Sequence, residues 1–126
     1  TWREGMHFCS HTASGELMCD ESSEVAKAYP SSPELLLAAL GSCIGSALAY
    51  FGERHDYKLR GMQIHLDYDM AQQPKRIGKI DVTVEIPQSL SEDQHRTLER
   101  VAEACLIHNT LLQSPEINIS LSGKSA

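Results

Sequence analysis

The sequence predicts an α+β domain, because two long helical patterns separate three regions of strand-like alternation. Its 126 residues are 41% hydrophobic and 22% charged, a balance typical of a single globular domain spanning residues 1–126. The expected order is an N-terminal β-hairpin, a long buried central helix, a second β-hairpin, a second helix and a final strand. Strands and helices that come in blocks in this way are typical of α+β folds.

The N-terminal hairpin is predicted from two short β-prone stretches between Thr1 and Asp20. They flank the turn-rich residues 11–15, where Gly15 can supply a positive φ. Residues 21–32 are polar and contain Pro30, so we expect a loop between this hairpin and the central helix.

The central helix has a strong start signal in Ser32-Pro33-Glu34: an N-cap serine, a proline at the first helical position and an acid in the first turn. We expect it to run to about Arg54. Residues 35–52 carry no charge, and this run of eighteen residues meets the lower length limit for a membrane span.

The centre of that helix is small rather than strongly apolar, which favours a buried helix over a membrane span. Gly41, Gly45, Ala49 and Gly52 follow one another at spacings of four and three, forming a ridge that allows a close neighbour. Interior glycines cost a helix up to about 1 kcal/mol each, so a packing reason is expected. The simplest is a helix that crosses closely, in this chain or in a dimer partner.

The second half of the chain shows strand-like alternation with a period of two, followed by the 3- and 4-residue spacing of a helix. Residues 62–70 and 80–86 show period-two alternation and are joined by a turn at 71–76, which predicts a hairpin. Residues 91–94 form a capping-box start, and one apolar face of a second helix then runs from Leu98 through Cys105 to Leu112. A last strand is predicted from the alternating apolar residues Ile117, Ile119 and Leu121.

Charge and cysteine usage narrow the classes of partner and compartment. The net charge of −6 argues against nucleic acid and anionic membranes as partners. The opening residues show no basic segment followed by an apolar run, so no signal peptide is expected. Four scattered cysteines without a Cys-x-x-Cys motif indicate free thiols and a reducing cytoplasm.

Two segments carry a family resemblance. Residues 33–43, PELLLAALGSC, and residues 104–110, ACLIHNT, resemble the OsmC/Ohr family of osmotically inducible and organic hydroperoxide resistance proteins. The resemblance implies an OsmC-like fold in an intertwined homodimer, with long central helices enclosed by β-sheets and two sites at the interface.

The resemblance also implies a chemistry. Cys43 would be the peroxidatic cysteine that reduces an organic hydroperoxide, Cys105 would resolve it as a disulfide, and an external dithiol would restore both. An arginine ahead of a glycine and a glutamate at the helix start complete the family's site; Arg3 and Glu34 match these here. No cofactor and no metal are expected.

The residues themselves constrain this chemistry. A peroxidatic cysteine reacts as a thiolate, but Cys43 lies beyond the first helical turn, where the helix dipole acts. Its own helix offers no cation before Arg54, so we expect one from elsewhere, and Arg3 is the candidate. Glu34 is nine residues before Cys43, which is 900° on a regular helix and places it on the opposite side.

Other interpretations of these residues remain open. One is that Cys43 is an inert core thiol, since free cysteines commonly behave as small hydrophobes. The main alternative is a non-peroxidase OsmC-like protein that binds an apolar ligand. Two departures from the family pattern favour it: Glu34 stands nine residues before Cys43, where the family commonly has ten, and Cys105 is followed by leucine where the family often has proline. Cys105 and His108 could also contribute to a zinc site, or His108 could relay a proton to Cys105.

Overall fold

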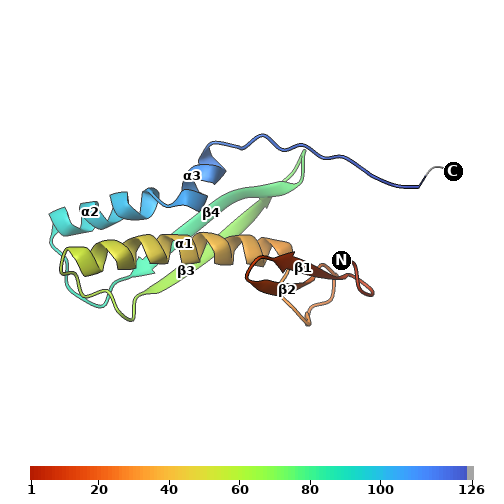
Figure 1. Cartoon of the computed structure of the whole chain (residues 1–126). Coiled ribbons are helices and arrows are strands. Elements are labelled where there is room, and N and C mark those ends of the chain that lie inside the picture. The colour runs from red at the N-terminus through yellow and green to blue at the C-terminus, as the bar shows by residue number, and fades with distance from the viewer. Residues whose placement is uncertain (125–126) are drawn as a thin grey trace.

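The computed structural model describes residues 1–124 as an α+β arrangement of two β-hairpins and three helices (Figure 1). This confirms the predicted fold class. The elements are β1 (His7–Thr12), β2 (Gly15–Asp20), α1 (Ser32–Arg54), β3 (Gln63–Ala71), β4 (Arg76–Glu85), α2 (Glu92–Glu103) and α3 (Leu106–Leu112).

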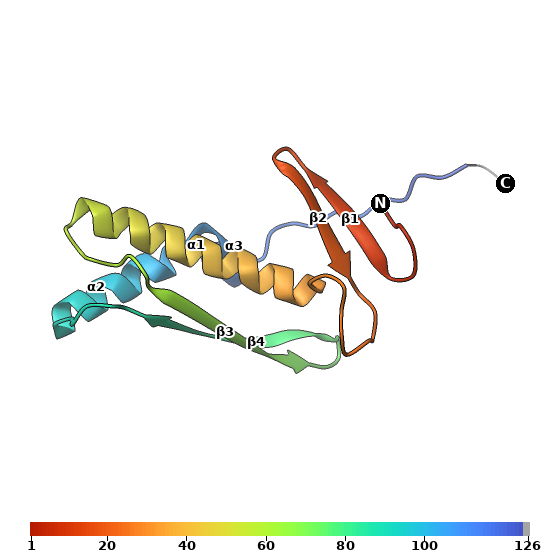
Figure 2. The ribbon, with the colours of Figure 1, turned by 90° about the horizontal axis from the view of Figure 1, so that it is seen from below.

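The N-terminal hairpin lies beside the first turns of α1 (Figure 2). β1 and β2 pair antiparallel, with His7 opposite Asp20 and Thr12 opposite Gly15. The Thr12 hydroxyl closes the turn: it accepts hydrogen bonds from the backbone amides of Ser14 and Gly15 and donates one to the Gly15 carbonyl. Gly15 has the positive φ, 154°, that the turn requires.

The helix α1 begins one residue away from the predicted cap. Ser31, not Ser32, is the N-cap, and it forms a capping box with Glu34, in which each side chain bonds the other residue's backbone amide. The helix ends at Arg54, where the sequence places it.

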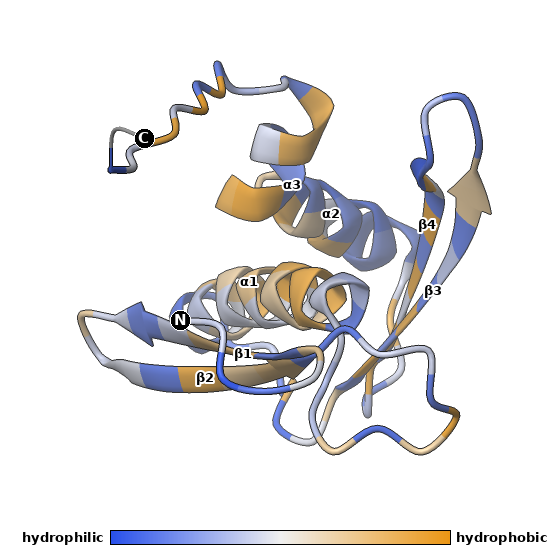
Figure 3. Cartoon of the chain, turned by 90° about the vertical axis from the view of Figure 1, so that its right-hand side faces the viewer, coloured by the Kyte–Doolittle hydropathy of each residue, from blue (hydrophilic) through white to orange (hydrophobic). Residues whose placement is uncertain are grey.

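The core is built on one face of α1. Leu40, Ile44 and Leu48 follow at spacings of four and are at most 4% exposed. They form one cluster with three buried residues from other segments: Leu59, Leu98 and Cys105. Because this face packs against α2, α3 and β3, α1 is the core helix of the domain (Figure 3). In residues 1–124, α1 is also the one helix whose length and composition would suit a membrane span.

The glycines of α1 make room for side chains of the chain itself. A Cβ placed on Gly41 would lie 2.9 Å from Leu66 Cδ1, and one on Gly45 would lie 3.0 Å from Ile64 Cδ1. Both neighbours are on β3. The expected close neighbour was a crossing helix; within this chain the neighbour is instead the apolar face of a strand.

The second predicted helix is divided into two. α2 ends at Glu103, and Cys105 adopts an extended backbone (φ −61°, ψ 138°) as the N-cap of α3. The sulfur of Cys105 accepts a hydrogen bond from the amide of His108, as a serine oxygen does at a helix N-cap. An apolar periodicity of 3 and 4 continues through the break, so the sequence pattern did not reveal it.

The predicted final strand is wrong for the chain on its own. Residues 114–124 leave α3 as an extended segment that points away from the body, and within residues 1–124 they pair with no strand (Figure 1). Ile117, Ile119 and Leu121 are 74%, 88% and 98% exposed. A strand forms only where a neighbouring edge completes its hydrogen bonds, and the direction of α3 takes this segment away from both hairpins.

Candidate active site

Cys43 and Cys105 meet in the middle of the molecule. Cys43 lies half-buried near the centre of α1, and Cys105 is 2% exposed at the break between α2 and α3. Cys43 packs against the core cluster that contains Cys105, and the thiol of Cys105 is close enough to act as a hydrogen-bond donor that lowers the pKa of Cys43. The two cysteines suggested by the family resemblance are therefore neighbours, and Cys43 is the more accessible of the two.

A backbone amide from the first turn of α3 bonds the sulfur of Cys43. The amide of Ile107 donates a hydrogen bond to it across 3.5 Å. Amides in the first turn of a helix have no partner within their own helix, so the break before α3 frees this group to point at α1. The role of Ile107 does not show in the sequence, because the apolar periodicity runs unbroken through the end of α2.

These contacts separate the pKa values of the two thiols. The hydrogen bond from Cys105 and, next, the amide of Ile107 lower the pKa of Cys43, although partial burial opposes them. Burial, followed by the hydrogen bond to Cys43, raises the pKa of Cys105. Cys43 is therefore the thiol that ionises first, and hydrogen bonds take the place of the cation that the sequence led us to expect.

Arg3 and Glu34 lie elsewhere. Arg3 is exposed in the segment before β1, and its backbone amide donates to the carbonyl of His7. Glu34 is exposed in the first turn of α1, where its carboxylate accepts hydrogen bonds from the backbone amide and the hydroxyl of Ser31. Over residues 1–124 no hydrogen bond or ion pair joins either side chain to Cys43. Because α1 is already helical at Ser32, Glu34 faces away from Cys43, as the 900° separation predicts.

His108 lies next to Cys105, but the two residues do not form a metal site with a third ligand in the described part of the chain. The ring atom Nδ1 of His108 is buried and has no hydrogen-bond partner in the part of the chain that the structure describes. Cys105 and His108 do not gather the third ligand that a zinc site needs: within residues 1–124, the group of three possible ligands is in the N-terminal hairpin. A proton-relay role for His108 stays a prediction.

The model of the OsmC-like protein family matches residues 25–120 of the chain, which include both cysteines and all elements from α1 to α3. The chain belongs to the OsmC-like family. No curated protein sequence matches it.

Solved structures of OsmC-like proteins have the same fold. The OsmC-like protein of Mycoplasma pneumoniae is 13% identical, with a TM-score of 0.70 and coverage of 89% of each chain. An OsmC-like protein of Vibrio cholerae is 15% identical, with a TM-score of 0.68 and coverage of 83% of this chain and 78% of that chain. A Legionella pneumophila protein described as an organic hydroperoxide resistance protein OsmC is 18% identical, with a TM-score of 0.64 and coverage of 88% and 85%.

Proposed function

We propose that this OsmC-like chain is a thiol peroxidase that reduces organic hydroperoxides through Cys43 and Cys105. The observation that carries the proposal is the packing of a half-buried thiol of lowered pKa, Cys43, against a buried thiol, Cys105, that contributes to the lowering. The description of the Legionella pneumophila protein as an organic hydroperoxide resistance protein supports the same chemistry.

The first step uses the thiolate of Cys43. Its sulfur attacks the terminal oxygen of the hydroperoxide, the O–O bond breaks, and the alkoxide leaves and takes a proton from water to become an alcohol. Cys43 is then a sulfenic acid. Hydrogen bonds from Cys105 and Ile107 stabilise the attacking thiolate, which keeps a larger fraction of Cys43 in the reactive form.

The second step uses the thiol of Cys105. Its sulfur attacks the sulfur of the sulfenic acid, the S–O bond breaks, and the hydroxyl group leaves with the Cys105 proton as water. The product is a Cys43–Cys105 disulfide. An external dithiol then reduces it by two exchange reactions, and the dithiol becomes a disulfide in turn. Such a cycle needs a compartment that keeps thiols reduced, and we propose the cytoplasm.

The surroundings of Cys43 favour an apolar substrate. Cys43 packs against the core cluster that contains Leu40, Ile44 and Leu48. An alkyl or aryl hydroperoxide can place its hydrocarbon part against such side chains, whereas hydrogen peroxide gains nothing from them. We therefore propose a preference for organic over inorganic peroxide.

The test is consumption of cumene or tert-butyl hydroperoxide by the purified, reduced chain with a dithiol as reductant. We expect turnover by the unaltered chain and by Cys19→Ser, and none by Cys43→Ser. Without reductant, one equivalent of peroxide should remove two thiols per chain; Cys43→Ser should lose none, and Cys105→Ser should lose only the thiol of Cys43. Turnover equal to that of the Cys43→Ser variant would refute the proposal.

One observation favours the alternative of an apolar-ligand binder. A pocket of about 280 Å³ lies between β4 and α2, lined mainly by apolar side chains such as Leu48, Val84 and Leu98, and Cys43 is not part of it. A protein that only binds a ligand there would keep all four thiols after peroxide treatment. The thiol count therefore separates the two functions.

We also propose that the chain works as a homodimer. Many large apolar side chains are exposed on the single chain, including Leu106, Leu112 and the alternating residues of the C-terminal segment. A second copy that covers them would remove this area from water. In such a dimer, Arg3 or Glu34 of one copy would serve the Cys43 of the other copy.

A further inference from the structure

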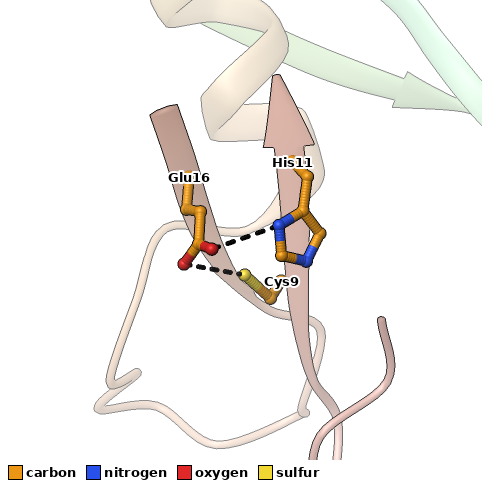
Figure 4. Close-up of side chains that lie close together, drawn as sticks. All are labelled: Cys9, His11 and Glu16. Atoms are coloured by element: carbon orange, nitrogen blue, oxygen red, sulfur yellow. Dashed lines mark hydrogen bonds and ion pairs between the residues drawn. The ribbon is translucent and has the colours of Figure 1, made fainter. Parts of the chain in front are cut away.

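A second group of chemically reactive side chains lies in the N-terminal hairpin, apart from Cys43 and Cys105. Cys9 and His11 come from β1, and Glu16 comes from β2. Figure 4 shows their sulfur, ring nitrogen and carboxylate oxygens facing one another. One donor atom from each residue lies within 4.8 Å of the other two.

The strand geometry brings the three side chains together. Cys9 and His11 are two residues apart on β1, so they project from the same face of the hairpin. Glu16 is directly opposite His11 in the register and diagonal to Cys9, whose own partner is Met18. Diagonal neighbours of this kind are within reach of long side chains. The Thr12 hydroxyl, which bonds the turn, fixes this register close to the site.

From this arrangement we propose that Cys9, His11 and Glu16 form a binding site for a Zn²⁺-type divalent cation. They supply one thiolate sulfur, one imidazole nitrogen and one carboxylate oxygen. These are the three ligand types that zinc takes in proteins, and a mixed set with sulfur and nitrogen selects against Mg²⁺ and Ca²⁺.

The separations of the three side chains are close to those of a tetrahedral zinc site. Metal–ligand bonds of about 2.0–2.3 Å at tetrahedral angles put nitrogen and oxygen about 3.4 Å apart, and sulfur and oxygen about 3.6 Å apart. Here His11 Nδ1 is 3.2 Å from Glu16 Oε1, and Cys9 Sγ is 3.7 Å from Glu16 Oε2. The two contacts use different oxygens of the same carboxylate, so Glu16 lies between Cys9 and His11, and a rotation of its carboxylate would turn one oxygen toward both.

Charge and exposure also suit a bound cation. The Cys9 thiol now donates its proton toward Glu16, and a metal would take the place of that proton. A thiolate and a carboxylate would then balance the two charges of the ion. Cys9 is 2% exposed, whereas His11 and Glu16 are exposed at their side chains, so water can fill the fourth position. Three protein ligands with one open position are typical of non-structural zinc sites.

This site departs from the expectation of a chain without metal. Cys9, His11 and Glu16 match no standard metal-binding spacing along the sequence. The site appears only when β1 and β2 are paired. It does not rest on the proposed peroxidase activity, because none of its three residues belongs to the cluster around Cys43 and Cys105.

Cobalt titration of the reduced full-length chain, without peroxide, tests the proposal. Co²⁺ occupies zinc sites and gives a thiolate-to-metal charge-transfer band. We expect one equivalent of Co²⁺ per chain, full displacement by Zn²⁺, and release of the Cys9 proton on binding. The band should disappear in Cys9→Ser. It should persist in Cys19→Ser, whose sulfur is on the opposite face because Cys19 pairs with Phe8.

Two further variants keep the test independent of folding. Glu16→Gln and His11→Gln change exposed side chains, so the hairpin should stay intact. Each should weaken binding by at least the roughly 10- to 100-fold that loss of an outer-shell partner costs. Absence of the band in the unaltered chain would overturn the proposal. So would its survival in Cys9→Ser, or its loss in Cys43→Ser or Cys105→Ser, which would place the metal at the redox pair.

Discussion

The backbone amide of Ile107 donates a hydrogen bond to the sulfur of Cys43 across 3.5 Å, although 64 positions separate the two residues. The contact exists because the chain breaks between α2 and α3 and presents the first turn of α3 to the middle of α1. Together with the thiol of Cys105 it stabilises negative charge on Cys43. These donors thus lower the pKa of Cys43 in the middle of α1, beyond the first turn in which the helix dipole acts.

Replacing Ile107 with proline removes this donor. Proline lacks the N–H group and is tolerated in the first turn of a helix. We expect a higher pKa of Cys43 and, at pH 7, alkylation slowed about fivefold, as loss of a hydrogen bond of about 1 kcal/mol predicts. Ile107→Ala is the matched control, because it removes the same side chain and keeps the amide. Equal alkylation rates in the two variants would show that the amide has no influence.

Changing Cys105 tests the larger of the two contributions. A thiolate is favoured wherever the pH exceeds the pKa, and the Cys105 hydrogen bond lowers the pKa of Cys43. Cys105→Ala should therefore move the pH profile of Cys43 alkylation to higher pH. Cys105→Ser retains a donor and should fall between the alanine variant and the unaltered chain. Mass spectrometry of the Cys43 peptide follows the reaction, and a profile that shifts to lower pH would contradict the assignment.

Cys19 should react slowly with alkylating reagents. A hydrogen bond to Glu21, with burial and the nearby negative charge, raises the pKa of Cys19 to about 11. Below that pH it stays a thiol, so at pH 8 we expect slow alkylation. Glu21→Gln removes the charge and should lower the pKa, which makes Cys19 react faster. Glu24→Gln, an exposed acid three residues on, should leave the rate unchanged. No change in the Glu21 variant would exclude this control of Cys19.

Most of the fold follows from local patterns in the sequence. The alternation in residues 62–70 and 80–86 predicted the β3–β4 hairpin, and the cap, proline and acid at the start of α1 placed that helix to within one residue. These features depend on neighbours along the chain, which a sequence shows directly. The pairing of Cys43 with Cys105, in contrast, was suggested only by the family resemblance.

What the sequence did not predict depends on tertiary contacts. The break at Cys105 lies inside an unbroken apolar periodicity, so only the three-dimensional packing shows the amide of Ile107 turned toward Cys43. The group of Cys9, His11 and Glu16 needs the hairpin register as well as the residue types. The C-terminal alternation predicted extended backbone, but over residues 1–124 this segment pairs with neither hairpin.

Gly52 should resist substitution more than an ordinary helical glycine. Alanine usually stabilises a helix by up to about 1 kcal/mol over glycine. At Gly52, however, a Cβ would lie 2.7 Å from Cδ1 and 3.1 Å from Cγ of Leu59, which is 4% exposed. We expect Gly52→Ala to lower the free energy of unfolding by about 1–3 kcal/mol in urea denaturation. In a Leu59→Val background the same change should cost less, and an equal cost in both would exclude the clash.

The C-terminal segment should hold two copies of the chain together. Ile117 and Ile119 are exposed on the single chain, and burial of side chains this size contributes about 1.5–3 kcal/mol each. We expect sedimentation to show a dimer, and Ile117→Asp with Ile119→Asp to weaken it by about a hundredfold or more. The matched control is Asn118→Asp with Ser120→Asp, which adds the same charge at the alternate positions and should remain a dimer. A monomeric unaltered chain, or equal weakening in both variants, would show that the apolar face of this segment forms no interface.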